Sequence, residues 1–146
     1  SGQRAVLLSG WGSLGDRPLP DTILKLDALP HDWLFPRMAA VVHHGGAGTT
    51  GAALRAGVPN LVVPFTADQP FWGRRVQQLG VGPAPIAQRR LTADRLAKAV
   101  RLMLDDTAMR DRAARLGAAI QDEDGPGTAI RVFERLMDNW RVHVRR

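Results

Sequence analysis

The segment HHGGAGTTG at residues 43–51 constrains this chain most, because it joins an apolar run to a helix-forming run. Residues 39–42 read AAVV, which is typical of a short buried strand. Residues 49–56 are rich in helix formers and stop at GVP, a common helix ending. The glycines between them let backbone N–H groups approach a ligand without an intervening Cβ. A helix N-terminus offers unpaired N–H groups and a positive dipole end, so we predict a diphosphate site here.

The composition is that of an ordinary globular domain, with 146 residues, 45% apolar and 23% charged. Cys is absent, which excludes disulfides and thiolate metal sites and favours a cytoplasmic location. No apolar run approaches the length of a membrane span, so we expect no transmembrane segment. The net charge of +6 is compatible with anionic ligands or an acidic partner surface. With 5% aromatic residues and no Tyr there is no stacking platform, and we expect no nucleic-acid partner.

Hydrophobic periodicity predicts alternating strands and helices. Short apolar runs predict strands at 4–9, 22–26, 39–43 and 60–64, with an edge-like extended piece at 81–86. Helical spacing predicts helices at 49–56, at 69–79, after a Thr92 cap, after a Thr107 cap, and in a last segment with Ile130, Phe133, Met137 and Trp140. We expect the last segment to bury one face, with Trp140 in the core. The predicted fold is α/β: a Rossmann-like parallel sheet with helices on both faces and a helical C-terminal tail.

Parallel strands of such a sheet place the loops that follow them at one edge. These loops are residues 10–15, 28–36, 44–48 and 64–70. They and the strand ends carry polar and aromatic residues: Ser9, Trp11, His31, Trp33, His44, Asp68, Gln69 and Trp72. A nucleotide-sugar would fit along this edge.

The segments VVHHGGAGTT and GVPNLVVPFTADQPFW, in this order and spacing, resemble the donor-binding C-terminal domain of GT-B fold glycosyltransferases. The resemblance is to the sterol glucosyltransferase-like and antibiotic glycosyltransferase branch of the UDP-glycosyltransferase superfamily. SGWG, LPHDWLFPR and LGVGPAPI are similar to that branch as well. The likeness covers about residues 4 to 105.

The resemblance implies a diphosphate-binding role for His44. It also implies that backbone N–H groups of Gly46, Ala47, Gly48 and Thr49 bind the phosphates, with the Thr49 hydroxyl on a phosphate oxygen. Breaking the bond between sugar and diphosphate places negative charge on the diphosphate, which preorganised donors stabilise. A helix N-terminus and a histidine can then replace a metal ion.

The resemblance also assigns the rest of the donor. Asp68 and Gln69 match a pair that holds hydroxyls of the donor sugar, and a carboxylate with an amide suits vicinal hydroxyls. The base and nucleoside would lie against Leu29, Pro30, His31, Trp33, Ser9 and Trp11.

His43 and His44 are adjacent, and adjacent side chains on an extended chain point to opposite faces. We therefore expect them to share no metal ion, and we expect His43 to be packed and structural. No further cluster has ligand spacing, so we expect no metal and no cofactor; the nucleotide-sugar is a substrate.

The sequence departs from the family pattern in two ways. Ala52 stands where plant relatives carry a ribose-binding glutamate, which leaves UDP and dTDP both open. Nothing corresponds to the N-terminal acceptor domain that carries the catalytic base, so we expect no catalytic residue in this chain. The first strand and helix of the donor domain are also missing. We therefore expect residues 1–146 to be a nucleotide-sugar-binding domain whose missing central strand comes from another chain or segment.

The sequence thus predicts the donor-binding part of an inverting, metal-independent glycosyltransferase. It would move a hexose from a UDP- or dTDP-sugar to a hydroxyl of a lipophilic small molecule, while this fragment alone would bind nucleotide weakly and transfer nothing. One alternative is a non-catalytic donor-like domain that acts as a partner or regulatory subunit. A second alternative is an NAD-dependent oxidoreductase, which is disfavoured because the glycine motif follows the third strand and not the first. A third alternative is a nucleic-acid binder, which only the net charge supports.

Overall fold

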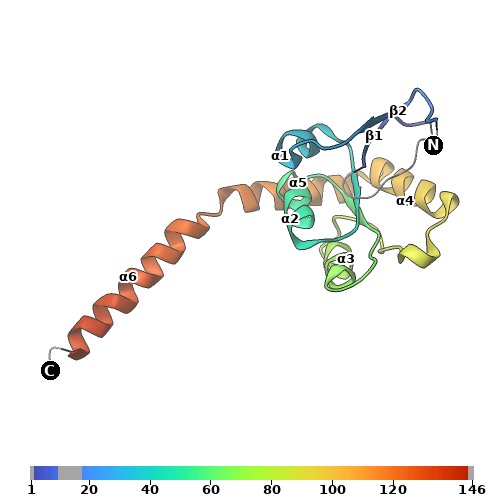
Figure 1. Ribbon diagram of the computed structural model, residues 1–146. Helices are drawn as coiled ribbons and strands as arrows, with labels where there is room; N and C mark the ends of the chain where they lie inside the picture. Colours follow the sequence, from blue (N-terminus) through green and yellow to red (C-terminus); the bar gives the residue numbers. More distant parts are fainter. Residues whose placement is uncertain (1, 10–17, 145–146) are drawn as a thin grey trace.

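The computed structural model describes residues 2–9 and 18–144. In chain order the elements are β1 (Ala5–Leu8), β2 (Ile23–Leu26), α1 (His31–Leu34), η1 (Phe35–Arg37), β3 (Val41–His43), α2 (Ala47–Arg55), β4 (Asn60–Val62), α3 (Gln69–Gln78), η2 (Gln88–Arg90), α4 (Ala93–Asp105), α5 (Thr107–Asp122) and α6 (Gly125–Val144). The elements up to α5 form one body, and α6 projects away from it (Figure 1).

The strands of the described chain form two separate parallel pairs. β1 pairs with β2, with Ala5 opposite Ile23, and β3 pairs with β4, with Val41 opposite Asn60. No pairing joins β1 to β3 among the described residues, so these strands do not make one continuous sheet. Residues 81–86 run along β4 as expected for an edge piece: the Asn60 N–H donates to the Val81 carbonyl and the Ile86 N–H to the Val62 carbonyl.

Helices cover both faces of the β3–β4 pair, as the sequence predicts. Side chains alternate along an extended chain, so Leu61 of β4 and Val63, which follows β4, share one face and Val62 lies on the other. Leu61 and Val63 pack with Met103 of α4. Val62 packs with Val76 of α3 and with α5. Leu34 of the four-residue helix α1 and Phe35 of η1 pack with Val41 and Ala53, which links this part of the chain to α2.

The C-terminal end of α2 is fixed by α5. Gly57 ends the helix at φ +72°, the left-handed conformation expected of the residue after a helix. A Cβ on Gly117 of α5 would come within 2.5 Å of the Gly57 Cα, so the two backbones cross in close contact. The Arg55 guanidinium donates to the Ile120 carbonyl at 3.1 Å, and the Gln121 amide donates to the Arg55 carbonyl at 2.7 Å.

The starts of α4 and α5 agree with the sequence to within one residue. The Thr92 hydroxyl accepts a hydrogen bond from the Arg95 N–H, which makes it the predicted cap of α4. The prediction of Thr107 as the next cap is wrong by one position. Asp106 caps α5, because its carboxylate accepts a hydrogen bond from the Met109 N–H at 2.8 Å and an anion favours the positive helix end.

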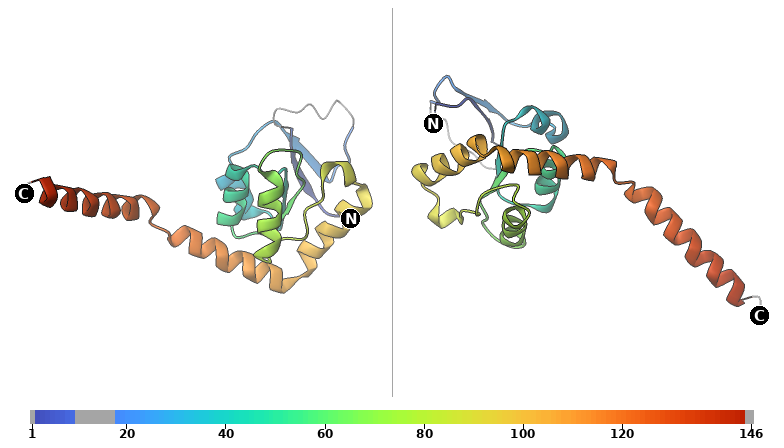
Figure 2. Two further views of the ribbon diagram at one scale, coloured as in Figure 1. Left: turned by 90° about the horizontal axis from the view of Figure 1, so that it is seen from below. Right: turned by 180° about the vertical axis from the view of Figure 1, so that it is seen from behind.

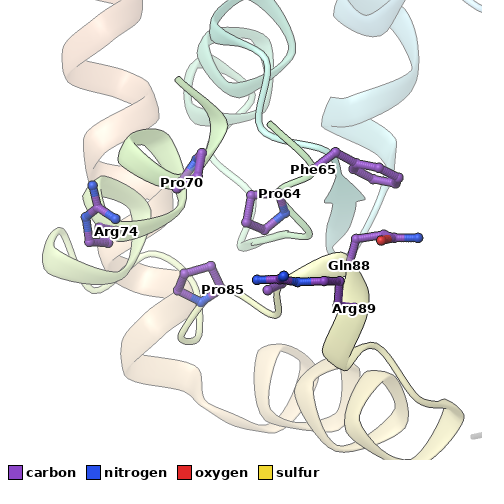
Figure 3. Close-up of a pocket in the computed structure, with 8 residues that line it drawn as sticks. Pro64, Phe65, Pro70, Arg74, Pro85, Gln88 and Arg89 are labelled. Carbon is purple, nitrogen blue, oxygen red and sulfur yellow. The ribbon is translucent and has the colours of Figure 1, made fainter. Parts of the chain in front are cut away.

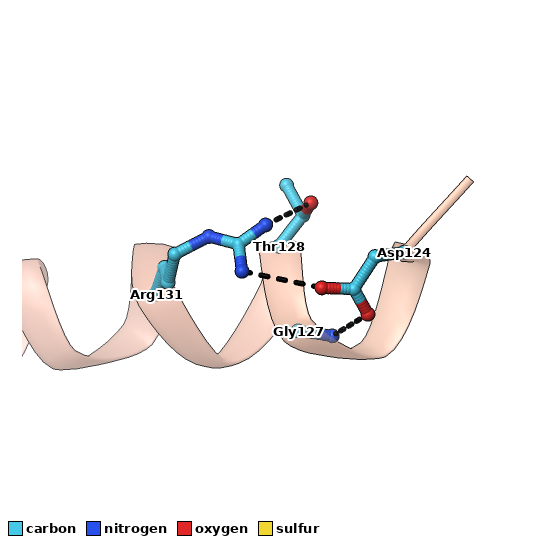
Figure 4. A network of polar contacts seen from close by, with 4 residues as sticks. All are labelled: Asp124, Gly127, Thr128 and Arg131. Atoms are coloured by element: carbon cyan, nitrogen blue, oxygen red, sulfur yellow. Dashed lines mark hydrogen bonds and ion pairs between the residues drawn. The ribbon is translucent and has the colours of Figure 1, made fainter. Parts of the chain in front are cut away.

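Residues 124–127 form a capping structure at the start of α6 (Figure 4). The Asp124 carboxylate accepts a hydrogen bond from the Gly127 N–H at 2.9 Å and pairs with the Arg131 guanidinium at 3.2 Å. Arg131 also donates to the Thr128 hydroxyl at 2.9 Å. Both charged side chains are about 60% exposed, so the ion pair itself adds little stability.

The prediction that α6 buries its apolar face is wrong for the described chain. Phe133 is 63% exposed and Trp140 60% exposed, and Ile130 and Leu136 are similarly accessible. The helix begins at Gly125 and projects away from the body (Figure 2), and these apolar side chains stay exposed. Among the described residues, no helix is both long enough and apolar enough to cross a membrane.

Candidate functional site

The glycine loop turns sharply between β3 and α2. Gly45 is buried and has φ +93°, which an L side chain rarely adopts. A Cβ at this position would also lie 2.5 Å from the Val62 Cγ1 atom and 3.1 Å from the Gln69 carbonyl oxygen. Glycine is therefore required here both by the backbone conformation and by the close packing of the loop against β4 and α3.

The N-terminus of α2 is open. Gly46 is the N-cap residue in an extended conformation, and no side chain makes a capping hydrogen bond to the first turn. Ala47, Gly48 and Thr49 therefore occupy the first three helical positions, two residues earlier than the sequence predicts. Ala47 and Gly48 are exposed, and a Cβ on Gly48 would meet nothing within 4 Å. The unpaired N–H groups of a first turn attract an anion, so this end of α2 is suited to phosphate.

His44 stands beside this open helix end. Its imidazole is exposed, and a Cβ on Gly46 would come within 2.6 Å of Nε2. The ring therefore lies against the N-cap residue, where an imidazole N–H can reach an anion bound to α2. The structure thus brings His44 together with Gly46, Ala47, Gly48 and Thr49, while their binding of diphosphate stays a prediction.

The His43 ring makes hydrogen-bonding contacts with the glycine loop and with β4. Its Nδ1 accepts a hydrogen bond from the Gly45 N–H at 3.0 Å, and its Nε2 lies 3.3 Å from the Asn60 Oδ1. Burial lowers the pKa of His43 to about 4; the Asn60 hydrogen bond opposes this shift, and the nearby His44 and His31 imidazoles add to it. The prediction of a packed, structural His43 agrees with this geometry. The role of Asn60 was not predicted, because its partner lies 17 residues away in sequence.

The Asp68–Gln69 pair lies at the start of α3, close to the glycine loop. Asp68 is the N-cap residue, yet its side chain makes no capping bond; its Oδ2 accepts a hydrogen bond from the Trp72 indole at 2.8 Å. The Gln69 Oε1 accepts hydrogen bonds from the N–H groups of Phe65 and Thr66 at 2.8 and 3.1 Å. The Gln69 amide nitrogen and the second Asp68 oxygen are the groups that remain suited to sugar hydroxyls, whose binding stays a prediction.

Ala67 adds a strained conformation to the same loop. Its φ is +53°, the positive value that non-glycine residues rarely adopt. Such strain costs about 1 to 3 kcal/mol and persists where surrounding contacts fix it. The side-chain oxygen of Gln69 supplies such contacts, because it accepts hydrogen bonds from Phe65 and Thr66, the two residues before Ala67. Sequence reasoning missed Ala67, since an alanine gives no signal of a left-handed backbone.

The residues predicted to hold the base are each in contact with other groups. The His31 ring stacks on Phe35 with centroids 4.5 Å apart. Trp33 is 52% exposed, and the Arg37 guanidinium lies 4.4 Å from its ring centroid. Half-buried Leu29 packs on the core cluster beneath α1.

One further member of the predicted base site, Ser9, directly follows β1. The Ser9 hydroxyl lies 3.1 Å from the Asp27 carboxylate, to which it can donate. Trp11 lies outside the described residues. A base site formed by these residues together with Leu29, His31 and Trp33 stays a prediction.

A pocket of about 600 Å³ lies beyond β4 and is half open to solvent. It is lined by Pro64, Phe65, Pro70, Arg74, Pro85, Ala87, Gln88 and Arg89 (Figure 3). None of these residues belongs to the predicted donor site, but Pro70 directly follows Gln69, so the pocket adjoins that site. In the described chain, no group of three or more His, Cys, Asp or Glu could hold a metal ion. Metal-independent transfer stays a prediction.

Comparisons with known proteins place the chain in a family and match its fold. Residues 12–136 match the family described as erythromycin biosynthesis protein CIII-like, C-terminal domain. A sterol 3-beta-glucosyltransferase of Arabidopsis thaliana is 50% identical over 143 residues, which cover 97% of this chain and 22% of that protein. The structure of the kitacinnamycin glycotransferase has a TM-score of 0.81 at 28% identity, over 90% of this chain and 34% of the other. Glycosyltransferase VinC, solved with DTDP, has a TM-score of 0.69 at 32% identity, over 81% and 31% of the two chains.

Fold and matches together define the class of this chain: it is a C-terminal donor-type α/β domain of GT-B glycosyltransferases. More specifically, the chain belongs to the erythromycin biosynthesis protein CIII-like C-terminal domain family. It spans between about a fifth and a third of the length of these relatives.

Proposed function

We propose that this chain is the donor-binding part of a glycosyltransferase that moves a hexose from a UDP- or dTDP-sugar to a hydroxyl of a lipophilic small molecule. The observation that carries the proposal is the open N-terminus of α2 with the His44 imidazole against its N-cap. The name of the Arabidopsis relative supports a sterol-like acceptor, and DTDP in the VinC structure supports a nucleoside diphosphate.

The proposed chemistry places the leaving diphosphate on α2. As the bond from the anomeric carbon to the phosphate oxygen breaks, negative charge grows on the diphosphate. The N–H groups of Ala47, Gly48 and Thr49 and the His44 ring stabilise that charge without reorganising. Asp68 and Gln69, which adjoin the glycine loop, hold the sugar hydroxyls, and attack from the opposite face by an acceptor hydroxyl inverts the anomeric centre.

We further propose that a parallel strand from outside this sequence fits between β1 and β3 and that an acceptor domain supplies the base. Two strand pairs with unpaired inner edges support the first part. On β1, the Ala5 and Ser9 N–H groups donate to β2, so by alternation those of Val6 and Leu8 face the other edge. On β3, the Val41 N–H faces β4, which leaves the Val42 N–H on the inner edge.

Calorimetric titration tests the proposal. UDP or dTDP should bind, and a UDP-sugar should compete for the same site. NAD should not bind, and duplex DNA should bind weakly with a steep salt dependence. Strong NAD binding without UDP binding would favour an oxidoreductase and overturn the proposal. Nucleotide binding without transfer by the longer polypeptide would favour a regulatory domain.

A further inference from the structure

A continuous line of polar contacts runs from the Val58–Pro59 turn to the glycine loop. The Asn60 amide nitrogen donates to the Val58 carbonyl at 3.2 Å, and this orients the Asn60 oxygen toward His43 Nε2, 3.3 Å away. His43 Nδ1 then accepts from the Gly45 N–H at 3.0 Å. A carbonyl oxygen only accepts, so Nε2 must carry the proton, and Nδ1 must be bare to accept from an N–H. One neutral tautomer of His43 satisfies the whole line.

The environment favours this neutral tautomer. Asn60 is fully buried, and its backbone N–H donates a hydrogen bond to the Val81 carbonyl. The backbone from which its side chain extends is therefore held in place. Burial also lowers the pKa of His43 to about 4, so the ring is uncharged at neutral pH. A bare Nδ1 is therefore available to the loop under physiological conditions.

The hydrogen bond from Gly45 determines how the chain enters α2. Gly45 is buried, and its N–H would lose a partner inside the protein if the imidazole were absent, which is unfavourable. With this N–H turned inward at φ +93°, the next residue, Gly46, begins the helix in an extended conformation. The outward N–H groups then belong to the first turn of α2, where no side chain competes for them.

We propose that His43 is a positioning residue for the anion site, which acts through Gly45 and does not touch the ligand. Asn60 selects the tautomer, the imidazole holds the Gly45 N–H, and the loop presents the start of α2. This inference rests on the proposed function of α2 as the diphosphate site.

The matched variants are His43→Asn and His43→Leu. An asparagine oxygen can accept the N–H two residues ahead, as in an Asx turn, so His43→Asn keeps the contact to Gly45. Leucine keeps bulk and removes the acceptor. We expect the Kd for UDP to rise about tenfold in His43→Leu and by less than about threefold in His43→Asn, since one hydrogen bond is at stake. Equal losses in both variants would indicate direct ligand contact and overturn the proposal, as would no loss in His43→Leu.

Nitrogen-15 NMR of the unaltered protein supplies a readout that needs no ligand. The His43 ring should show a protonated Nε2 and a bare Nδ1, and Gly45 amide exchange should be slow. His43→Asn should keep this exchange slow. The opposite tautomer, or fast exchange of Gly45, would overturn the inference even if His43→Leu does not fold. Failure of UDP to bind would instead count against the proposed function alone, because tautomer and amide exchange are measured without nucleotide.

Discussion

The side-chain carbonyl of Gln69 accepts a hydrogen bond from the backbone N–H of Phe65 at 2.8 Å. A second bond from Thr66 at 3.1 Å makes Gln69 a clamp on the loop that precedes α3. A residue predicted to hold sugar therefore also holds the backbone of its own loop. Its two roles use different atoms, so they can be separated by mutation.

Gln69→Ala removes the acceptor for both N–H groups and should lower the free energy of unfolding by about 1 kcal/mol, since the loop is exposed. Gln69→Glu keeps an oxygen in place and should change stability little, while it loses the amide N–H that a sugar hydroxyl would accept from. Urea denaturation checks stability, and titration with a UDP-sugar checks binding. Similar stability of Gln69→Ala and the original protein would show that the clamp contributes nothing.

Asp68→Ala should weaken binding of a UDP-sugar and leave UDP binding unchanged, because the carboxylate is predicted to contact the sugar alone. The variant also loses the hydrogen bond from the Trp72 indole, an exposed bond that contributes little to stability. Parallel titrations with UDP and a UDP-sugar make the comparison. A parallel loss for both ligands would make Asp68 a structural residue of the loop.

His44→Ala should weaken UDP binding by about 1–3 kcal/mol, the range for a charge-assisted hydrogen bond. The ring is exposed, so the thermal midpoint should hardly change. Calorimetry with UDP measures the first effect and thermal unfolding the second. If the variant binds UDP with unaltered affinity, His44 does not contact the diphosphate.

Gly46→Ala places a methyl group 2.6 Å from the His44 Nε2, so the imidazole must move from the helix end. UDP affinity should fall for the same reason as in His44→Ala, and a double variant should be no weaker than either single variant. Gly51→Ala is the matched control, because a Cβ there meets nothing within 4 Å. It should raise stability by about 0.5–1 kcal/mol through helix propensity and leave affinity unchanged.

Stability should depend on pH through His43. Its pKa is about 4 in the folded state and 6.5 in the unfolded state, so between these values only the unfolded chain binds the proton. Stability should therefore be complete above pH 6.5 and should fall toward pH 4 by about 1.4 kcal/mol per pH unit, to at most about 3 kcal/mol. Urea midpoints of the original protein and His43→Asn, compared at pH 7 and 5, should show the smaller pH dependence in the variant.

The two unpaired strand edges give a prediction about a longer polypeptide. If a parallel strand fits between β1 and β3, the amides of Val6, Leu8 and Val42 should exchange slowly once the residues upstream of this sequence are included. The Ala5 and Val41 amides already donate within their strand pairs and serve as controls. Hydrogen exchange followed by NMR makes the measurement. Fast exchange of the three edge amides in the longer protein would place the additional strand elsewhere.

Local chemistry made much of this fold predictable. Gly57 and Gly80 have the positive φ expected of residues that end helices, and Thr92 caps α4 as predicted. Contacts between distant residues were not predictable in the same way. Asn60 stands at the start of an apolar run in the sequence, and only the fold brings it next to His43. Trp140 has the helical spacing of a buried residue, but no described residue covers it. Periodicity shows that a face is apolar and leaves open what covers it.

The crossing of Gly57 and Gly117 has a consequence for the opposite end of α2. Because the last turn of α2 is in close contact with α5, α2 cannot shift along its axis when an anion binds at its first turn. A nucleotide would therefore meet donors already in place and would lose little free energy to ordering them. Bulkier residues at position 117 should loosen nucleotide binding from the far end of the helix, without touching the nucleotide.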